Sequence, residues 1–492
     1  MNNYLIFYIS LFVISSFACE GPNEQTTIVN GYPEIYPDYK DICIPCNIAP
    51  LNFMVKGDID KILVDLRAHD KHLKTRGSFK VSFPLNDFKD LLDENKNDTI
   101  WVTVNAKIKG KWQSYKPFFW RVISDPIDNY LTYRLIEPGY EVWNSVSIAQ
   151  RNISNFDEIN IADNNLTEGS CMNCHIGSKQ NPEKSFFHIR GPKGMTVIAD
   201  GGKLRKLNTK PEGAYSNLIY GNWHPSGKFI AFSTNVVIPS FHSYRNKRAF
   251  VYDTISDVVV LDIEKDEILT NRLISRKQMW ETFPEFSTDG KKLYFCTAKA
   301  VKLPTEHDSL KYSLCAIDFD PVTRTFGNHV DTLINGPKFG KTVSEPKSSP
   351  DGKYILFTCF SYGTFPIWHE DARLYSYEIS TGKIDTLSQL NNNKNYSNSY
   401  HSWSSNSRWL VFASKRDNGL YGKPYFSYID EKGMAHRPFV LPQKDAEFYD
   451  FTYKSFNIPE LYVVPRKFDA MDIEKLFDED SPLEVVKYAG KN

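Results

Sequence analysis

Alternating apolar and polar positions dominate the chain and predict β-strands. The alternation is clear over residues 79–83 and 100–108, where every second side chain is apolar and falls on one face. Only residues 87–94 suggest a short helix. This pattern predicts a mainly β fold that begins with a β-sandwich-like domain over residues 47–160.

A repeat occupies the second half of the chain. Four segments combine a polar turn with an apolar strand: NWHPSGKFIAFS from Asn222, EFSTDGKKLYFC from Glu285, KSSPDGKYILFT from Lys347 and SWSSNSRWLVFA from Ser402. Their turn residues, Gly227, Gly290, Gly352 and Ser407, are separated by 63, 62 and 55 residues. A period of this length predicts the blades of a β-propeller, and we expect the first residues of the four segments to share one level around its channel.

Two weaker segments extend the repeat. Residues 196–207 and 448–464 resemble partial blades that would close the ring. The sequence therefore predicts a C-terminal five- or six-bladed β-propeller over residues 195–465, followed by a C-terminal tail over residues 466–492.

The first residues have the pattern of an export signal. Residues 4–18 form an apolar run of signal-peptide length, too short for a comfortable membrane span. Cys19 follows Ala18 directly, so residues 1–18 look like a lipoprotein signal and Cys19 is the predicted lipidation site, with a soluble periplasmic protein as the alternative. Residues 19–46 contain four prolines and predict an extended tether.

Composition excludes some classes of function. The 59 Lys and Arg residues balance 59 Asp and Glu residues, which argues against a nucleic-acid partner. Eight cysteines in 492 residues are too few for a disulfide-stapled scaffold. An exported chain works where thiols oxidise, so the positions of these cysteines matter more than their number.

The sequence CMNCH at Cys171 has the c-type haem attachment pattern. Two thiols three residues apart, Cys171 and Cys174, match the two vinyl groups on one haem edge, and His175 would ligate the iron. We therefore predict one covalent haem c in a short haem-binding segment over residues 161–194. The alternatives are a structural disulfide, a redox-active pair, or a zinc site completed by the CxxC of Cys43 and Cys46.

The sixth iron ligand is predicted to be His188, 13 residues after His175. Met195 is the next candidate, and a ligand from the propeller or an open site completes the alternatives. The choice matters because methionine ligation raises the reduction potential and a second histidine lowers it.

The repeat segment SSPDGKYILFT resembles the repeat of TolB-type, WD40-like β-propellers. The order of signal, CNIAP segment at Cys46, haem motif and propeller also resembles a group of exported TolB-like proteins of Gram-negative bacteria. The resemblance covers residues 195–465 and implies an exported propeller protein of the cell envelope.

These features together predict an exported, lipid-anchored c-type haem protein that transfers electrons. Its propeller would dock a redox or envelope protein partner on the periplasmic side of the outer or inner membrane. The alternative is a propeller scaffold or binding protein whose haem is structural or senses redox state or gas. The chain contains neither GxSxG nor HExxH, so the two common hydrolase motifs are missing.

Overall fold

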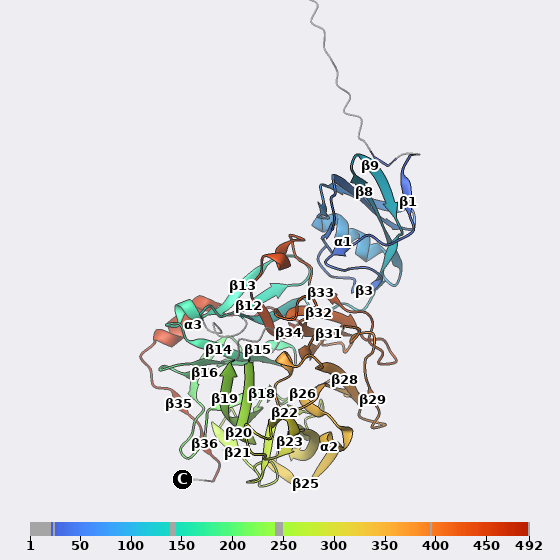
Figure 1. The fold of residues 1–492 in the computed structure, drawn as a ribbon. Coiled ribbons are helices and arrows are strands. Elements are labelled where there is room, and N and C mark those ends of the chain that lie inside the picture. Colours follow the sequence, from blue (N-terminus) through green and yellow to red (C-terminus); the bar gives the residue numbers. More distant parts are fainter. Residues whose placement is uncertain (1–20, 23–24, 138–143, 242–248, 394–395, 491–492) are drawn as a thin grey trace, which may run out of the picture.

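The computed structural model describes residues 21–22, 25–137, 144–241, 249–393 and 396–490, and these residues form a mainly β fold (Figure 1). The prediction of a mainly β chain with several sheets is confirmed. The predicted signal and Cys19 lie outside the described residues. Within the described part of the chain, no helix has the length and apolar character needed to cross a membrane.

An N-terminal β domain spans residues 27–123 and lies at one end of the molecule (Figure 1). Its larger sheet joins β1 (Thr27–Val29), β3 (Ile42–Pro45), β5 (Lys61–Ala68), β6 (Lys71–Gly77), β8 (Thr99–Ile108), β9 (Lys111–Tyr115) and β10 (Phe118–Ile123). A smaller sheet joins β2 (Ile35–Tyr36), β4 (Phe53–Val55) and β7 (Lys80–Val81). Helix α1 (Leu85–Glu94) buries Phe88, whose ring lies 6.1 Å from that of Trp120.

The predicted tether over residues 19–46 differs from the structure, because part of it belongs to this domain. Strand β3 pairs in parallel with β10, and its Ile42 and Ile44 are buried in the core. The prolines around this segment suggested irregular chain, yet the alternation of Ile42 and Ile44 is what places β3 in the sheet.

The remaining strands form six sheets that we number as blades 1 to 6. Blade 1 is β14 (Cys171–Ser178), β15 (Asn181–Arg190), β16 (Met195–Asp200) and β17 (Lys203–Asn208); blade 2 is β18 (Leu218–Trp223), β19 (Phe229–Phe241), β20 (Ala249–Asp262) and β21 (Glu267–Leu269). Blade 3 is β22 (Met279–Phe286), β23 (Lys292–Lys299), β24 (Ser313–Asp320) and β25 (Thr325–Ile334); blade 4 is β26 (Thr342–Ser348), β27 (Tyr354–Phe360), β28 (Arg373–Glu378) and β29 (Ile384–Asp385). Blade 5 is β30 (Asn398–Trp403), β31 (Trp409–Ser414), β32 (Lys423–Tyr428) and β33 (Phe439–Val440).

Blade 6 closes the ring with strands from both ends of the chain. Strand β34 (Ser455–Tyr462) pairs with β11 (Tyr130–Ile136), which continues into β12 (Ser147–Asn152) and β13 (Glu158–Asp163). The inner strands then contact one another in the order β14, β18, β22, β26, β30, β34 and back to β14. Six sheets in a closed ring are the arrangement of a β-propeller.

The boundaries of the sequence-predicted domains differ from this arrangement. The sequence placed residues 130–160 in the sandwich-like domain, whereas they supply three strands of blade 6. It set residues 161–194 apart as a haem segment, whereas β14 and β15 begin blade 1. Both segments have ordinary strand alternation, which does not reveal the sheet to which a strand belongs.

The short helices and the tail complete the fold. They are η1 (Asn164–Leu166), η2 (His307–Ser309), α2 (Gly336–Phe339), η3 (Pro366–Trp368), η4 (Phe448–Asp450), α3 (Ala470–Asp478), β35 (Glu484–Val485) and β36 (Lys487–Tyr488). In the tail, β35 adds in parallel to β17 and β36 to β21, so the tail extends the outer edges of blades 1 and 2.

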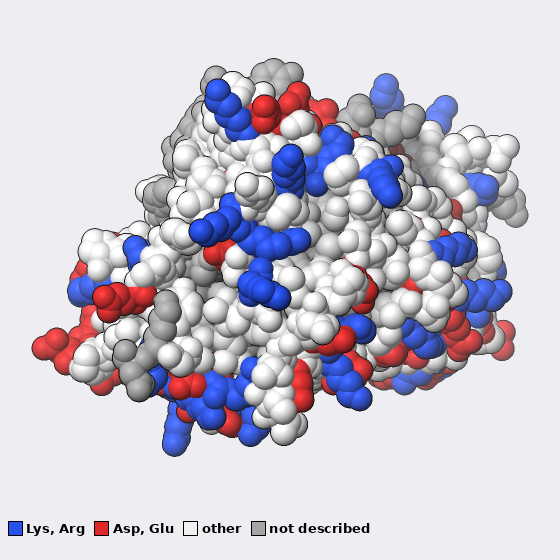
Figure 2. All heavy atoms as spheres, turned by 90° about the horizontal axis from the view of Figure 1, so that it is seen from below, with Lys and Arg blue, Asp and Glu red and all other residues white. Residues whose placement is uncertain are grey.

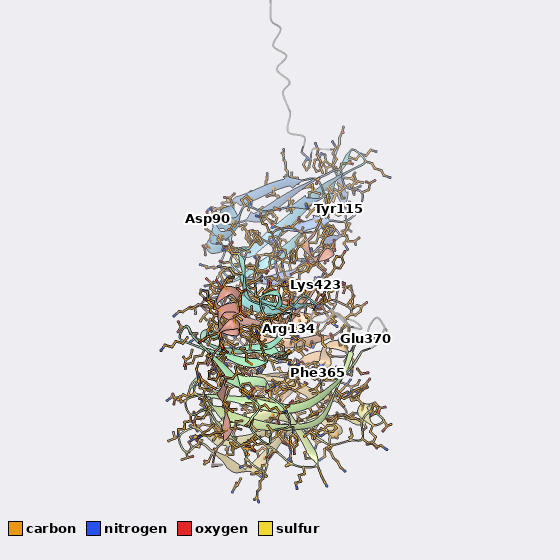
Figure 3. All side chains as sticks on the ribbon, turned by 90° about the vertical axis from the view of Figure 1, so that its left-hand side faces the viewer. Asp90, Tyr115, Arg134, Phe365, Glu370 and Lys423 are labelled. Carbon is orange, nitrogen blue, oxygen red and sulfur yellow. The ribbon has the colours of Figure 1, made fainter. Side chains whose placement is uncertain are left out.

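The N-terminal domain packs on blade 5 through a continuous apolar core and a polar seam. Asp128 accepts hydrogen bonds from Ser405, and the indole of Trp409 donates to the carbonyl of Asp125. Lys423 of β32 donates to the hydroxyl of Tyr36 at this junction (Figure 3). The face away from this domain carries both signs of charge, with Lys and Arg gathered toward its middle (Figure 2).

Blades 1 and 6 meet too closely to admit a side chain at Gly177. A Cβ atom there would lie 2.2 Å from the ring of Tyr462. We expect Gly177→Ala to lower the free energy of unfolding by about 1–3 kcal/mol, the usual cost of overpacking, in a denaturant titration. Gly31→Ala is the control, since its Cβ would meet only one atom, at 4.0 Å. Equal stability of the two variants would contradict this contact between the blades.

Candidate functional site

Every inner strand carries a bulge at the same place, and the bulge residues line one pocket. These residues have positive φ and are Cys174, Tyr220, Phe283, Glu345, Tyr400 and Ile458. The bulge sets two residues against one partner on the second strand, and that partner is aromatic and buried in every blade: Phe187, Phe232, Phe295, Phe357, Phe412 and Tyr133. The extra residue re-aims the side chains toward the ring axis.

This pocket, which we call the channel pocket, has a volume of about 370 Å³. Besides the bulge residues, η3 and the loop before it contribute Phe365, Ile367 and Trp368, and the β19–β20 hairpin contributes Val237 and Val251. Figure 3 shows Arg134 and Phe365 in the middle part of the propeller, well away from Asp90 and Tyr115 of the N-terminal domain. The lining is mostly apolar and aromatic, as in sites for small organic molecules.

Four cations also line the pocket: Arg134, Arg190, Lys347 and Lys415. Three carboxyl groups face them, those of Glu137, Glu345 and Glu460, and burial weakens the charge of the last two. Burial raises the pKa of Glu345 to about 7, although the amide of Tyr400 and the hydroxyl of Thr358 donate to its carboxylate. Burial also raises the pKa of Glu460. The pocket is therefore net positive near neutral pH.

A second ring lies directly below the bulge residues. Its members are Ile176, Asn222, Glu285, Lys347, Ser402 and Glu460, and they border a cavity of about 50 Å³. Lys347 donates to the amide oxygen of Asn222, and Lys179 lies 3.1 Å from Glu285. The predicted common level of Asn222, Glu285, Lys347 and Ser402 is confirmed, and these two contacts join blade 2 to blade 4 and blade 1 to blade 3.

The CMNCH sequence forms the inner strand of blade 1. Cys171 and Cys174 line the channel pocket, and Cys174 packs in a cluster with Leu218 and Trp223 of blade 2. His175 faces the other way, toward blade 6, where burial and then the cations Arg466 and Arg134 lower its pKa to about 3. Neither ring nitrogen has a hydrogen-bond partner among the described residues.

His175 has a structural counterpart four blades further on. His401 also follows its blade's bulge residue, and its Nε2 lies 3.2 Å from the carbonyl oxygen of Leu356 on the second strand of the preceding blade. His175 likewise faces the second strand of its preceding blade, near the carbonyl of Thr132. The histidine of CMNCH therefore occupies a packing position between blades.

The residues of CMNCH do not fit a c-type haem. The thiols and the imidazole lie on opposite faces of the blade 1 sheet, so a haem attached to Cys171 and Cys174 would have its iron on the wrong side for His175. A disulfide is equally misplaced, since three residues of extended chain span roughly 10 Å, beyond the usual reach of a disulfide.

His188 does not serve as a sixth ligand either. It lies on β15, its Nδ1 is 2.8 Å from the hydroxyl oxygen of Thr196, and its ring contacts Phe232 of blade 2. Burial lowers its pKa to about 3. It thus lies on the face of the sheet opposite His175. Met195 is buried in a third place, a cluster with Met172 and Phe187 between blades 1 and 6.

The zinc alternative also lacks its donor set. Cys43 and Cys46 belong to the N-terminal domain, and Cys43 contacts His436 of blade 5 rather than the CMNCH strand. In the part of the chain that the structure describes, no three His, Cys, Asp or Glu side chains converge to hold a metal ion.

Sequence reasoning missed the bulge residues of the pocket. In the repeat they stand two positions before Asn222, Glu285, Lys347 and Ser402, and the aromatic partner recurs on the strand after the turn. Extending that pattern finds Phe187 in blade 1 and Tyr133 in blade 6. A repeat defined by its turn glycines does not include blade 1, because the turn of that blade is built from Lys179 and Gln180, both with positive φ.

Comparisons with known proteins return likenesses of fold only. No family model and no curated protein matches the chain. A putative dipeptidyl aminopeptidase IV from Bacteroides ovatus is 11% identical with a TM-score of 0.27, over 65% of this chain and 59% of that one. A puromycin-hydrolyzing peptidase from Mycobacterium tuberculosis is 11% identical with a TM-score of 0.36, over 85% of this chain and 57% of that one. Prolyl oligopeptidase B from Galerina marginata is 10% identical with a TM-score of 0.35, over 83% and 55%.

The prediction of an electron-transferring haem protein is wrong. The three solved structures named above are described as peptidases, and the chain spans less than two-thirds of each. Such remote likeness shows no activity in this chain. The deciding observation is the placement of His175 and the two thiols on opposite faces of one strand.

A maturation experiment checks this correction. We expect protein made together with a c-type cytochrome maturation system to have the mass of the unmodified chain and no haem absorption, because His175 is held between blades 1 and 6. Intact mass and a visible spectrum measure both properties. One covalent haem that is lost in Cys174→Ser would restore the haem assignment.

Proposed function

We propose that this protein binds a small organic anion with an aromatic or apolar body in the channel pocket of its propeller. The observation that carries the proposal is the convergence of six bulge side chains, one from each blade, on a pocket that is apolar and net positive. In each blade the bulge residue at this level has an unfavourable positive φ, and backbone strain of that kind is common at functional sites.

The aromatic side chains supply the apolar contact. Tyr220 lies 4.9 Å from Phe283 and 5.5 Å from Phe365, measured between ring centroids. These three aromatic rings come from blades 2, 3 and 4, so a planar ligand that packs on them contacts three of the six blades. Rings held by one another present a large contact area at little cost in conformational entropy.

The cations supply the anion preference. Lys415 is buried and its ammonium lies over the ring of Trp368, both at the pocket wall. Arg134 reaches the pocket from blade 6 and donates to the carbonyl of Met172 at 3.3 Å. With Glu345 largely uncharged below pH 7, an anionic group of the ligand meets more positive than negative charge.

Two fluorescent probes of the same shape test the proposal. Anilinonaphthalene sulfonate carries an aromatic body and an anion, and N-phenyl-naphthylamine has the body alone. We expect the sulfonate to bind the folded protein and Lys415→Met to weaken it about tenfold, the worth of one charge-assisted hydrogen bond. The neutral probe should bind wild type and Lys415→Met equally in a fluorescence titration.

The control variant is Lys71→Met, which removes an exposed cation of the N-terminal domain and should change neither probe. An equal loss of affinity for the sulfonate probe in Lys415→Met and Lys71→Met would show that the probe binds through general surface charge. Failure of Tyr220→Ala to weaken either probe would place the binding outside the channel and contradict the proposal.

We also propose that the protein acts outside the cytoplasm. The apolar run before Cys19 and the likeness of SSPDGKYILFT to TolB-type repeats support an exported protein that is tethered to the cell envelope by a lipid on Cys19. A pocket for a small anion is then open to molecules that pass through the periplasm.

Fractionation tests the tether. We expect the wild-type protein to stay with membranes after a high-salt wash, since a lipid anchor does not depend on charge. Cys19→Ser should appear in the soluble fraction or remain as an uncleaved precursor, as judged by immunoblot size. Release of the wild type by salt would contradict lipidation.

A further inference from the structure

The CIPC segment of the N-terminal domain contains a three-residue relay that the channel pocket does not use. The Sγ of Cys43 lies 3.6 Å from Nδ1 of His436. On the other side of the ring, Nε2 of His436 lies 3.5 Å from Oδ2 of Asp430. Thiol, imidazole and carboxylate thus stand in line across the junction between the N-terminal domain and blade 5.

The fold fixes all three groups. Cys43 lies between the buried Ile42 and Ile44 on β3, so strand alternation turns its side chain away from the core and toward blade 5. His436 follows β32, its amide donates to the carbonyl of Tyr428, and its ring lies 5.4 Å from the Tyr428 ring. Asp430 begins the tight turn that leads to His436.

The order of the groups is that of a nucleophile, a base and an orienting acid. The Asp430 carboxylate lies 3.5 Å from Nε2, and its negative charge favours the tautomer with the hydrogen on Nε2, in which Nδ1 is free to accept the thiol proton. Burial raises the pKa of Cys43 to about 11, with Arg121 opposing this and Asp430 adding to it. The thiol is therefore protonated near neutral pH, and its reactivity depends on a neighbouring base.

We propose that Cys43 is a nucleophilic thiol that exchanges with small disulfides, with His436 as its general base and Asp430 as the residue that positions the imidazole. This site is separate from the channel pocket and does not depend on the proposed anion binding. Cys43 is partly buried, and about a third of the side chains of His436 (35%) and Asp430 (31%) is exposed.

The exchange balances without any further reactant. The Sγ of Cys43 attacks one sulfur of the small disulfide while its proton moves to Nδ1 of His436. A new S–S bond forms, the original S–S bond breaks, and the leaving thiolate takes the proton from His436. Cys43 is oxidised to a mixed disulfide and half of the small disulfide is reduced to a thiol. An oxidising compartment supplies such disulfides.

Cys46 does not resolve this mixed disulfide. It comes three residues later, after the extended β3, and its thiol lies 3.5 Å from the carbonyl oxygen of Ser124 rather than near His436. Three extended residues span roughly 10 Å, too far for a direct bridge. The product is therefore a stable modification of Cys43, and Cys46 is an internal control in the same segment.

The test measures how fast hydroxyethyl disulfide, a small neutral probe, modifies each cysteine. After quenching and peptide mapping by mass spectrometry, we expect Cys43 to react at least tenfold faster than Cys46 near neutral pH. His436→Asn should slow Cys43 at least tenfold and leave Cys46 unchanged, because a positioned base contributes about 10²–10⁴ in rate. Asp430→Asn should have a smaller effect in the same direction.

The matched control is His72→Asn, since His72 pairs with Asp65 in the same domain but has no cysteine partner. It should leave both rates unchanged. At high pH the His436→Asn rate should rise toward that of wild type as the thiol ionises without help. Equal rates at Cys43 and Cys46, an unchanged Cys43 rate in His436→Asn, or an internal Cys43–Cys46 disulfide in the isolated protein would overturn the proposal.

Discussion

The pairing of β34 with β11 is the interaction on which the rest of the propeller depends. Leu461 of β34 opposes Leu131 of β11, which joins a strand near the C-terminus to one that precedes every other blade. Without β34, blade 6 has no inner strand, and β14 and β30 each lose a neighbour. The channel pocket would then lose Ile458 and Glu460, and His175 and Gly177 would lose the surface against which they pack. A ring closed by sequence-distant strands is thus the condition for both the fold and the site.

The sequence predicted the β class and the four central blades because their signals are local. Within each of these blades, the turn, for example at Gly227, Gly290 or Gly352, lies within a dozen residues of the strand alternation that follows it. Blades 1 and 6, where the ring closes, were misassigned because their signals are not local. The partner of β11 lies more than 300 residues away, and blade 1 makes its first turn without glycine, through Lys179 and Gln180. A local pattern identifies a strand but not its sheet.

The site was predicted at the right strand and with the wrong chemistry. Cys171 and Cys174 do face the channel, whereas His175 and His188 lie on opposite faces of the same sheet. A motif of cysteine and histidine specifies haem attachment only when the backbone brings the thiols and the imidazole to one side. Here the bulge at Cys174 sends the next side chain toward blade 6. The pocket that results depends on six such bulges, and no single segment of sequence contains more than one of them.

The residue after each bulge shows how freely this chain can vary at the position of His175. That position is Pro284, Pro346 and Pro459 in blades 3, 4 and 6, and Gly221 in blade 2. Proline has no amide hydrogen, so the ring does not require a backbone hydrogen bond from this residue. Its occupant is constrained by the space between blades and not by the ladder. A histidine there is one of several residues that fill the same space between blades, so a cysteine–histidine signature can be part of the packing of a propeller strand.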